Sequence, residues 1–385
     1  MNRIYLDNQA TTPIDPQVFS AMEPWLKDKF GNAASRNHTY GWEAKEIIDI
    51  SRENVAHIIG ASPKEIIFTS GATEANNIAL QGAAHFNKGN GNHIITLKTE
   101  HKAVLDICDY LGKEGFEITY LAVQKDGLVD IVKLQESIRP DTIMVSVMHA
   151  NNEIGVIQPI IKIGQVCKLN KIIFHVDAAQ SVGKIPIDIN KMGIDLLSIS
   201  AHKMYGPKGV GALYIRRKNP RVQLQPIMYG GGHEMGIRSG TLAVHNIVGL
   251  GKACEISKNV MIKESNRIKV LRDKLITMIQ QNIPKTIING NLERRLHGNL
   301  NMSFPGANNE EIIASMPDIA ISSGAACTSS TMEASHVLLA LGLSKQKAYS
   351  SLRFGIGRFN TSKEIEVVAN SIVHCMQKLT KMSYV

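Results

Sequence analysis

The chain has 385 residues, of which 44% are hydrophobic and 20% charged, so it has the composition of a globular protein and the length of about two domains. The net charge is +9, but the basic residues are scattered and aromatic residues that could stack on bases make up only 5%. No apolar stretch is long enough to cross a membrane, and the first residues lack the apolar core of a signal peptide. We therefore expect a cytoplasmic protein that binds neither membranes nor nucleic acid directly.

Short β-branched apolar runs alternate with amphipathic helical stretches between Glu65 and Ile215. The strand candidates, in chain order, are EIIFTS, NHIITL, FEITYL, TIMVSV, KIIFHV, DLLSIS and GALYI. This alternation indicates βαβ units, with a mostly parallel sheet that is covered by helices on both faces. The predicted fold class is therefore α/β.

The pattern changes after Gly249. The sequence predicts a long amphipathic helix over about residues 251–281, an isolated strand in NLNMSFP, further helices, and a last helix that begins at a capping box from Thr361 to Glu364. These elements indicate a smaller α+β domain. We expect residues 15–257 to form the large domain, residues 258–385 to form the small domain, and residues 1–14 to join the small domain.

Five cysteines, an odd number with no C-x-x-C pair, indicate neither a disulfide framework nor a structural zinc site. Four of them lie in apolar helical contexts and are expected in the core: Cys108, Cys167, Cys254 and Cys375. Cys327 differs because its neighbours in ISSGAACTSS are small and can bury little surface. We therefore expect Cys327 to lie on a mobile loop.

Polar residues follow almost every strand candidate. In open α/β sheets ligands bind outside the carboxyl ends of the strands. The residues found there are Gly71, Ala72, Thr73, His101, Asn152, Asp177, Gln180, Ser200, His202 and Lys203. The segment TSGATEANN places Thr73 at a strand-to-helix turn, where backbone N–H groups favour a phosphate. Taken alone, this motif is better explained by residues that turn the chain and cap the helix.

Asp177 and Lys203 are 203 − 177 = 26 residues apart, a spacing that suits one strand–helix–strand crossover. The two residues would then end adjacent strands and face one crevice, although Asp177 could instead cap a helix over AAQSVG. A phosphate cradle, a carboxylate and a lysine in one crevice match the needs of pyridoxal phosphate. This cofactor needs its phosphate held, its ring nitrogen kept protonated and its aldehyde captured as a Schiff base. His101 is then expected over the ring, with Ser200 and His202 at the phosphate.

The sequence also resembles the pyridoxal-phosphate cysteine desulfurases of the housekeeping iron–sulfur-cluster type (group I), in the class V aminotransferase family. The resemblance extends over nearly the whole chain and includes YLDNQATTP, FGNAASRNHTYG, TSGATEANN, EHKAV, NNEIGVIQP, HVDAAQ, SAHKMYGPKGVGALY, GGGHEMGIRSGT, SSGAACTSS and SSLRFGIGRF. It implies a fold-type-I aminotransferase-like architecture, with a seven-stranded sheet in the large domain. It also implies a homodimer.

The resemblance implies a role for each candidate. Lys203 would bond the cofactor, Asp177 would pair with the ring nitrogen, Gln180 would donate to the ring oxygen, and His101 would stack on the ring. Other residues would bind the cofactor, most of them at its phosphate: Ala72, Thr73, Asn152, Ser200, His202 and Thr241 of the partner subunit. Asn152 and Arg353 would hold the substrate carboxylate, for which a guanidinium is well shaped, although Arg353 could instead form a structural ion pair.

Cys327 would be the persulfide-forming nucleophile. The implied reaction converts L-cysteine to L-alanine, and the sulfur on Cys327 passes to acceptors, among them an iron–sulfur scaffold protein and the machinery of tRNA thiolation. No resident metal is expected, although the resemblance allows Cys327 to contact a cluster iron during transfer. A selenocysteine lyase or an aminotransferase would share the cofactor residues without depending on Cys327, and a non-catalytic basic binding module would be colourless.

Two departures from the family pattern stand out. Ala33 replaces the proline of the family's FGNP, which should affect only loop stiffness. The sequence ends in KLTKMSYV, without the Pro-Leu-Trp-containing tail with which housekeeping members dock a scaffold protein. We therefore expect weaker docking of that partner and unimpaired activity.

Overall fold

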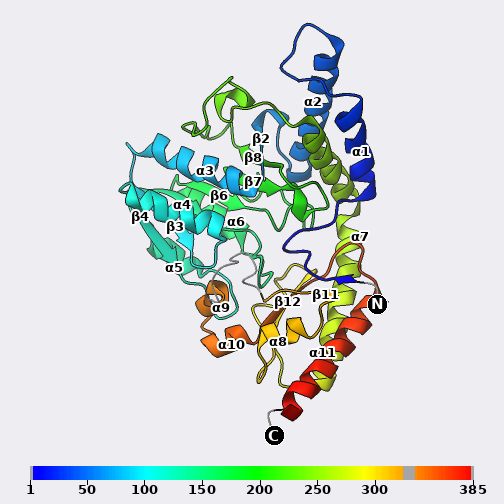
Figure 1. The fold of residues 1–385 in the computed structure, drawn as a ribbon. Helices are drawn as coiled ribbons and strands as arrows, with labels where there is room; N and C mark the ends of the chain where they lie inside the picture. Colours follow the sequence, from blue (N-terminus) through cyan, green and yellow to red (C-terminus); the bar gives the residue numbers. More distant parts are fainter. Residues whose placement is uncertain (1–2, 324–333, 383–385) are drawn as a thin grey trace.

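The structure is a computed structural model that describes residues 3–323 and 334–382 (Figure 1). All seven strand candidates form strands of one sheet: β2 (Ile66–Thr69), β3 (His93–Leu97), β4 (Glu117–Leu121), β5 (Thr142–Ser146), β6 (Ile173–Asp177), β7 (Leu196–Ser200) and β8 (Gly211–Ile215). Their order is β2-β8-β7-β6-β5-β3-β4. Only β8 runs opposite to the other six strands of this sheet, so the prediction of a mostly parallel α/β sheet is confirmed.

Helices cover both faces of the sheet. One face packs on α3 (Ala72–Asn87) and α4 (Lys102–Lys113). The other packs on α2 (Thr39–Ile59), α5 (Ile131–Glu136), α6 (Ile160–Leu169) and the first part of α7 (Val244–Asn282). Successive strand residues point to opposite faces, so that Ile67 lies in the first core while Ile66 and Phe68 lie in the second. Burial on both faces explains why most of the strands are nearly continuous apolar runs, whereas the edge strand β4 is partly exposed.

The long helix α7 is longer than predicted, since it begins at Val244 rather than near residue 251. Along its first part it packs on α1 (Pro16–Lys27) and α2, and along its second part on α11 (Ser362–Met382) (Figure 1). Its side chains enter the sheet core up to Met261 and a separate core from Ile268 onwards.

The separate core contains a small antiparallel sheet. Its central strand is β10 (Asn299–Ser303), as predicted from NLNMSFP, between β9 (Ile287–Ile288) and β12 (Ser351–Gly355). The N-terminal strand β1 (Ile4–Tyr5) pairs with β11 (Ile319–Ala320). The remaining short elements are η1 (Pro63–Glu65), η2 (Ala201–Lys203), η3 (Glu234–Gly236), α8 (Asn309–Ala314), α9 (His336–Ala340) and α10 (Lys345–Tyr349). The capping box before α11 is confirmed, because the Thr361 N–H donates to Glu364 at 2.8 Å and the Glu364 N–H to the Thr361 hydroxyl at 3.3 Å.

One local prediction is wrong. Strands β6 and β7 are adjacent and parallel, as the spacing of Asp177 and Lys203 indicated, but residues 178–195 cross between them through turns rather than a helix. The segment AAQSVG therefore has no helix for Asp177 to cap. Gly183 has φ +76, a left-handed conformation that interrupts a helix, and the nearby Pro186 disfavours continuing one.

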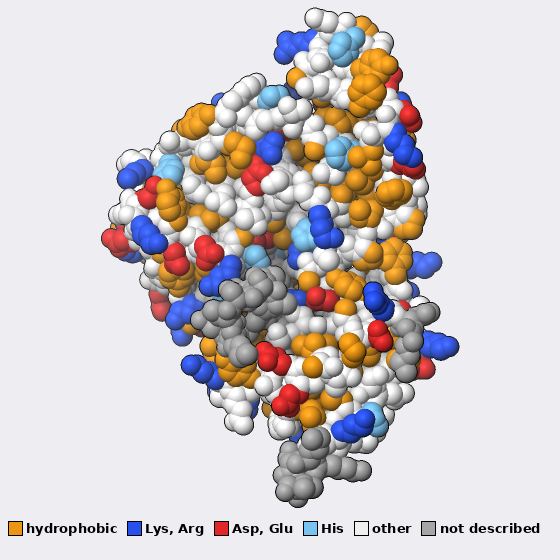
Figure 2. Space-filling view, in the orientation of Figure 1, with side chains coloured by type: hydrophobic (Ala, Val, Ile, Leu, Met, Phe, Trp, Pro, Cys, Tyr) orange, Lys and Arg blue, Asp and Glu red, His pale blue; other side chains and the backbone are white. Residues whose placement is uncertain are grey.

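The cysteines Cys108, Cys167, Cys254 and Cys375 are buried, as predicted, whereas Cys327 lies outside the described residues. In the described parts of the chain, no helix is both long and apolar enough to span a bilayer. On the face shown in Figure 2, basic and acidic side chains are interspersed rather than gathered into one basic band.

Candidate active site

A pocket of about 420 Å³, a volume typical of small-molecule sites, opens where the parallel strands end. The structure brings ten of the predicted residues together in its lining: Ala72, Thr73, His101, Asn152, Asp177, Gln180, Ser200, His202, Lys203 and Arg353. Thr241 is exposed and does not line this pocket, and Cys327 lies outside the described residues. The pocket thus unites residues from the large sheet with Arg353 from β12.

The N-terminus of α3 forms one end of the pocket. Its N-cap residue is Gly71, which makes no side-chain capping bond, so the interpretation that this turn only caps the helix is not supported. The first N–H groups of a helix have no partner within the helix and favour an anion. The Ser200 and His202 side chains lie in the same pocket. Glu74 also lines the pocket, where Arg238 neutralises it through a 2.7 Å ion pair.

His202 is neutral near pH 7. Burial, followed by the positive charges of Lys203 and Lys208, lowers the pKa of its ring to about 4. The Nδ1 atom lies 3.1 Å from the Thr11 hydroxyl, which orients the ring. A neutral imidazole with a further N–H can donate to a phosphate without an added charge of its own.

Two glycines bring the α3 turn onto the sheet. A Cβ atom at Gly211 would lie 2.3 Å from the Ile199 carbonyl oxygen and 2.7 Å from the Gly71 Cα atom. Glycine at position 211 therefore makes room for the backbone of Ile199 and of Gly71. Among the glycines after Lys203, Gly209 lines the pocket itself.

Asp177 ends β6 and is buried. One of its carboxylate oxygens accepts from the Ala179 N–H at 2.9 Å, and the other accepts from the Asn76 side-chain amide at 2.9 Å. Sequence reasoning missed Asn76, although it lies three residues after Thr73 and so on the same side of α3. The two donors hold the carboxylate in one orientation at the lip of the pocket.

Lys203 lies in η2, directly after β7. Its amine donates to the main-chain carbonyls of Gln9 and Ala10, both at 2.6 Å. The Gln9 carbonyl also accepts from the Gln180 amide at 2.9 Å. Sequence reasoning missed these two acceptors because every residue has a main-chain carbonyl, and such a group leaves no signal in residue type.

His101 is the N-cap of α4, where its Nδ1 atom accepts from the Ala103 N–H at 3.1 Å. This bond ties the imidazole to the start of the helix while the residue lines the pocket. The ring is therefore held at a fixed place beside the strand ends.

Arg353 is 1% exposed and forms the ion pair that the sequence analysis left open, with Asp7 at 2.7 Å. It also lines the pocket and donates to the Asn152 carbonyl at 3.1 Å. Its Nε atom has no hydrogen-bond partner among the described residues. Behind it, burial raises the pKa of the Glu153 carboxyl to about 7.

The donor set fits pyridoxal phosphate. The α3 turn, Ser200 and His202 supply neutral donors for a phosphate, Asp177 supplies a fixed carboxylate, and Lys203 supplies an amine within the same pocket. Asp177 and Lys203 follow neighbouring strands, so one small ring can reach both. Fold and pocket together define a pyridoxal-phosphate enzyme of the aminotransferase type.

Comparisons with known proteins support the same class of enzyme. The aminotransferase class-V family pattern matches residues 4–368. Cysteine desulfurase IscS of Haemophilus influenzae is 53% identical over 382 residues, 99% of this chain and 94% of the relative, and that of Tolumonas auensis is 54% identical over the same shares. Among solved structures, a NifS-like protein superposes with a TM-score of 0.91 at 36% identity, covering 97% of this chain and 99% of that one. DndA from Streptomyces lividans gives 0.77 at 40% identity, covering 90% and 97%.

The chain belongs to the cysteine desulfurases of the class V aminotransferase family. The predictions of family, enzyme class, fold class and pyridoxal-phosphate cofactor are thereby confirmed.

Proposed function

We propose that this cysteine desulfurase converts L-cysteine to L-alanine and holds the released sulfur as a persulfide on Cys327. The observation that carries the proposal is the meeting of Asp177, Lys203 and Arg353 in one pocket. A carboxylate for a ring nitrogen, an amine for an aldehyde and a guanidinium for a substrate carboxylate are the groups that this chemistry needs.

Each residue has its own part in the proposal. When bound, pyridoxal phosphate withdraws electrons from the α-carbon of the amino acid joined to it. Asp177 would keep the ring nitrogen protonated, and the Lys203 amine would take the substrate's α-proton. Arg353 and Asn152 bind the substrate carboxylate. His101 would lie against the ring of the bound cofactor, and Gln180 would donate to the ring oxygen.

Cys327 performs the sulfur step. Its thiolate attacks the substrate sulfur, so that an S–S bond forms while the substrate C–S bond breaks. The electron pair of the broken bond stays on the substrate carbon, which takes up a proton to become the methyl group of alanine. Three of the other thiols are poorly suited, because burial raises the pKa of Cys108 to about 12 and also raises the pKa values of Cys167 and Cys254.

We also propose a homodimer, in which Thr241 of the partner subunit completes the phosphate site. Large apolar side chains stand exposed on and between α1 and α2, at the upper right of Figure 2, and a second copy would cover them: Phe19, Leu26, Phe30, Tyr40 and Trp42. We propose that the protein is cytoplasmic and that it passes sulfur to an iron–sulfur scaffold and to tRNA thiolation. We also propose that the boundary between the two domains lies near residues 257 and 258, inside α7.

Replacing Cys327 by serine tests the proposal. The variant should keep the cofactor's visible absorbance and still change its spectrum when L-cysteine is added, because the pocket is unaltered. It should release almost no alanine and carry no persulfide, because a hydroxyl is a far weaker nucleophile toward sulfur. Cys108→Ala is the matched control and should form persulfide normally per folded molecule. Near-normal turnover in Cys327→Ser would instead indicate a lyase or an aminotransferase.

A further inference from the structure

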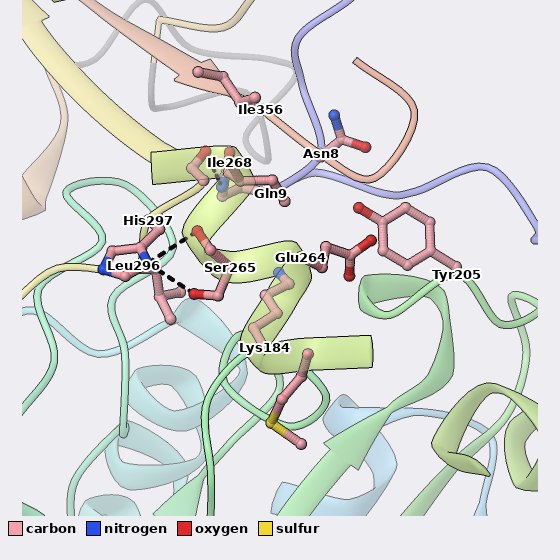
Figure 3. A pocket seen from close by; sticks show the side chains of 12 residues that line it. Asn8, Gln9, Lys184, Tyr205, Glu264, Ser265, Ile268, Leu296, His297 and Ile356 are labelled. Atoms are coloured by element: carbon pink, nitrogen blue, oxygen red, sulfur yellow. Dashed lines mark hydrogen bonds between the residues drawn. The ribbon is translucent and has the colours of Figure 1, made fainter. Parts of the chain in front are cut away.

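A second cavity, of about 40 Å³, shares Gln9 with the cofactor pocket. It is large enough for water, and its lining includes Lys184, Glu264, Ser265 and His297 (Figure 3). The His297 ring is tied to the Ser265 hydroxyl at 2.8 Å. Lys184 comes from the turns between β6 and β7, four residues after Gln180.

A chain of hydrogen bonds joins this cavity to the pocket. The Lys184 amine donates to the Gln180 side-chain oxygen at 3.2 Å. The Gln180 side-chain nitrogen donates to the Gln9 carbonyl at 2.9 Å, and that carbonyl also accepts from Lys203 at 2.6 Å. Two lysines are thus connected through one side-chain amide and one main-chain carbonyl.

The chain selects one of two orientations of Gln180. A side-chain amide has a donor end and an acceptor end, and a half-turn exchanges them. If Lys184 were absent, the amide oxygen would lose this donor, and the orientation would depend on the bond from the Gln180 nitrogen to the Gln9 carbonyl. Because Lys184 donates to the oxygen in either of its protonation states, it keeps the oxygen on the cavity side. The Gln180 nitrogen, with its second N–H, then remains on the side of Gln9 and Lys203.

Keeping an amine at this place is costly. Burial, and then repulsion from Lys203, lowers the pKa of Lys184 to about 7, while attraction to Glu264 and repulsion from Arg353 have smaller effects. Glu264 itself pairs with Arg358 at 2.7 Å. A methionine of similar length would fill the space without this penalty, so stability alone does not explain a lysine here.

We propose that Lys184 is a positioning residue that holds the Gln180 amide with its N–H groups toward the cofactor pocket. This inference rests on the proposed function of the pocket, in which Gln180 donates to the ring oxygen of the cofactor. It adds a residue from outside the pocket lining to the machinery that orients the cofactor.

The test uses the cofactor-loaded enzyme without L-cysteine. The midpoint of the pH titration of the cofactor's visible absorbance should shift by about 0.7 pH unit in Lys184→Met, in the same direction as in Gln180→Leu. The double variant should shift no further than Gln180→Leu, because both changes remove the same hydrogen bond. Lys191→Met, an exposed lysine in the same connection, should titrate like the wild type.

A wild-type titration in Lys184→Met, or shifts that add in the double variant, would overturn the inference. Thermal unfolding separates positioning from a structural role, since Lys184→Met should unfold at the wild-type temperature or above. Unfolding at a clearly lower temperature would also count against it. These measurements contain no sulfur transfer, so they stand even if Cys327→Ser were to keep its turnover.

Discussion

Gly211→Ala should damage the cofactor site from a distance, through the backbone alone. The new Cβ atom would lie 2.3 Å from the Ile199 carbonyl oxygen, so that oxygen would have to move by about 1 Å to reach an ordinary 3.4 Å contact. Gly211 is paired with Ser200 on β7 and with Thr69 on β2, so the movement would disturb both ladders. Overpacking of this kind costs about 1–3 kcal/mol, and a clash with backbone belongs at the upper end.

The damage should also reach the phosphate end of the pocket, because the same Cβ atom would lie 2.7 Å from the Cα atom of Gly71 at the start of α3. Thermal unfolding of the cofactor-free protein and titration with pyridoxal phosphate measure the two effects, and both the unfolding temperature and the cofactor affinity should fall. Gly89→Ala is the control, since its Cβ atom would meet nothing within 4 Å. If the unfolding temperature and the cofactor affinity of Gly211→Ala matched those of Gly89→Ala, the reasoning would be refuted.

Two further predictions concern side chains of the pocket. Asn76→Leu should weaken cofactor binding by about tenfold, because the Asp177 carboxylate loses a donor at 2.9 Å. Urea unfolding should show that the fold persists. An unchanged affinity in a cofactor titration would contradict this prediction. In the cofactor-free protein, the ring of His202 should titrate near pH 4, because its pKa is lowered from the ordinary value of 6.5. The folded protein therefore favours the neutral ring, and the stability that this ring contributes is present above pH 6.5 and is lost as the pH falls toward 4. NMR titration, with the His202 signal assigned by its loss in His202→Gln, measures this; a midpoint near 6.5 would show that burial and the neighbouring lysines do not act as described.

Local patterns in the sequence were enough to predict the sheet. Most of the strands are runs of apolar residues that are buried on both faces, the edge strand β4 being the exception, and each run is recognisable within five or six positions. The polar residues at the strand ends were predictable for the same reason, since once a strand is recognised the residue that follows it is known from the sequence. The helix predicted between β6 and β7 failed because Gly183 and Pro186 interrupt a segment whose composition is otherwise permissive.

The sequence by itself therefore determined which side chains stand at the carboxyl edge of the sheet, because strand ends and residue types are local properties. Only the tertiary structure decided what those side chains contact. The Lys203 amine meets the Gln9 carbonyl across 194 residues of chain, and Arg353 meets Asp7 across 346. Such contacts depend on how β1, β12 and the long helix α7 bring distant segments together, and on main-chain groups that every residue carries alike.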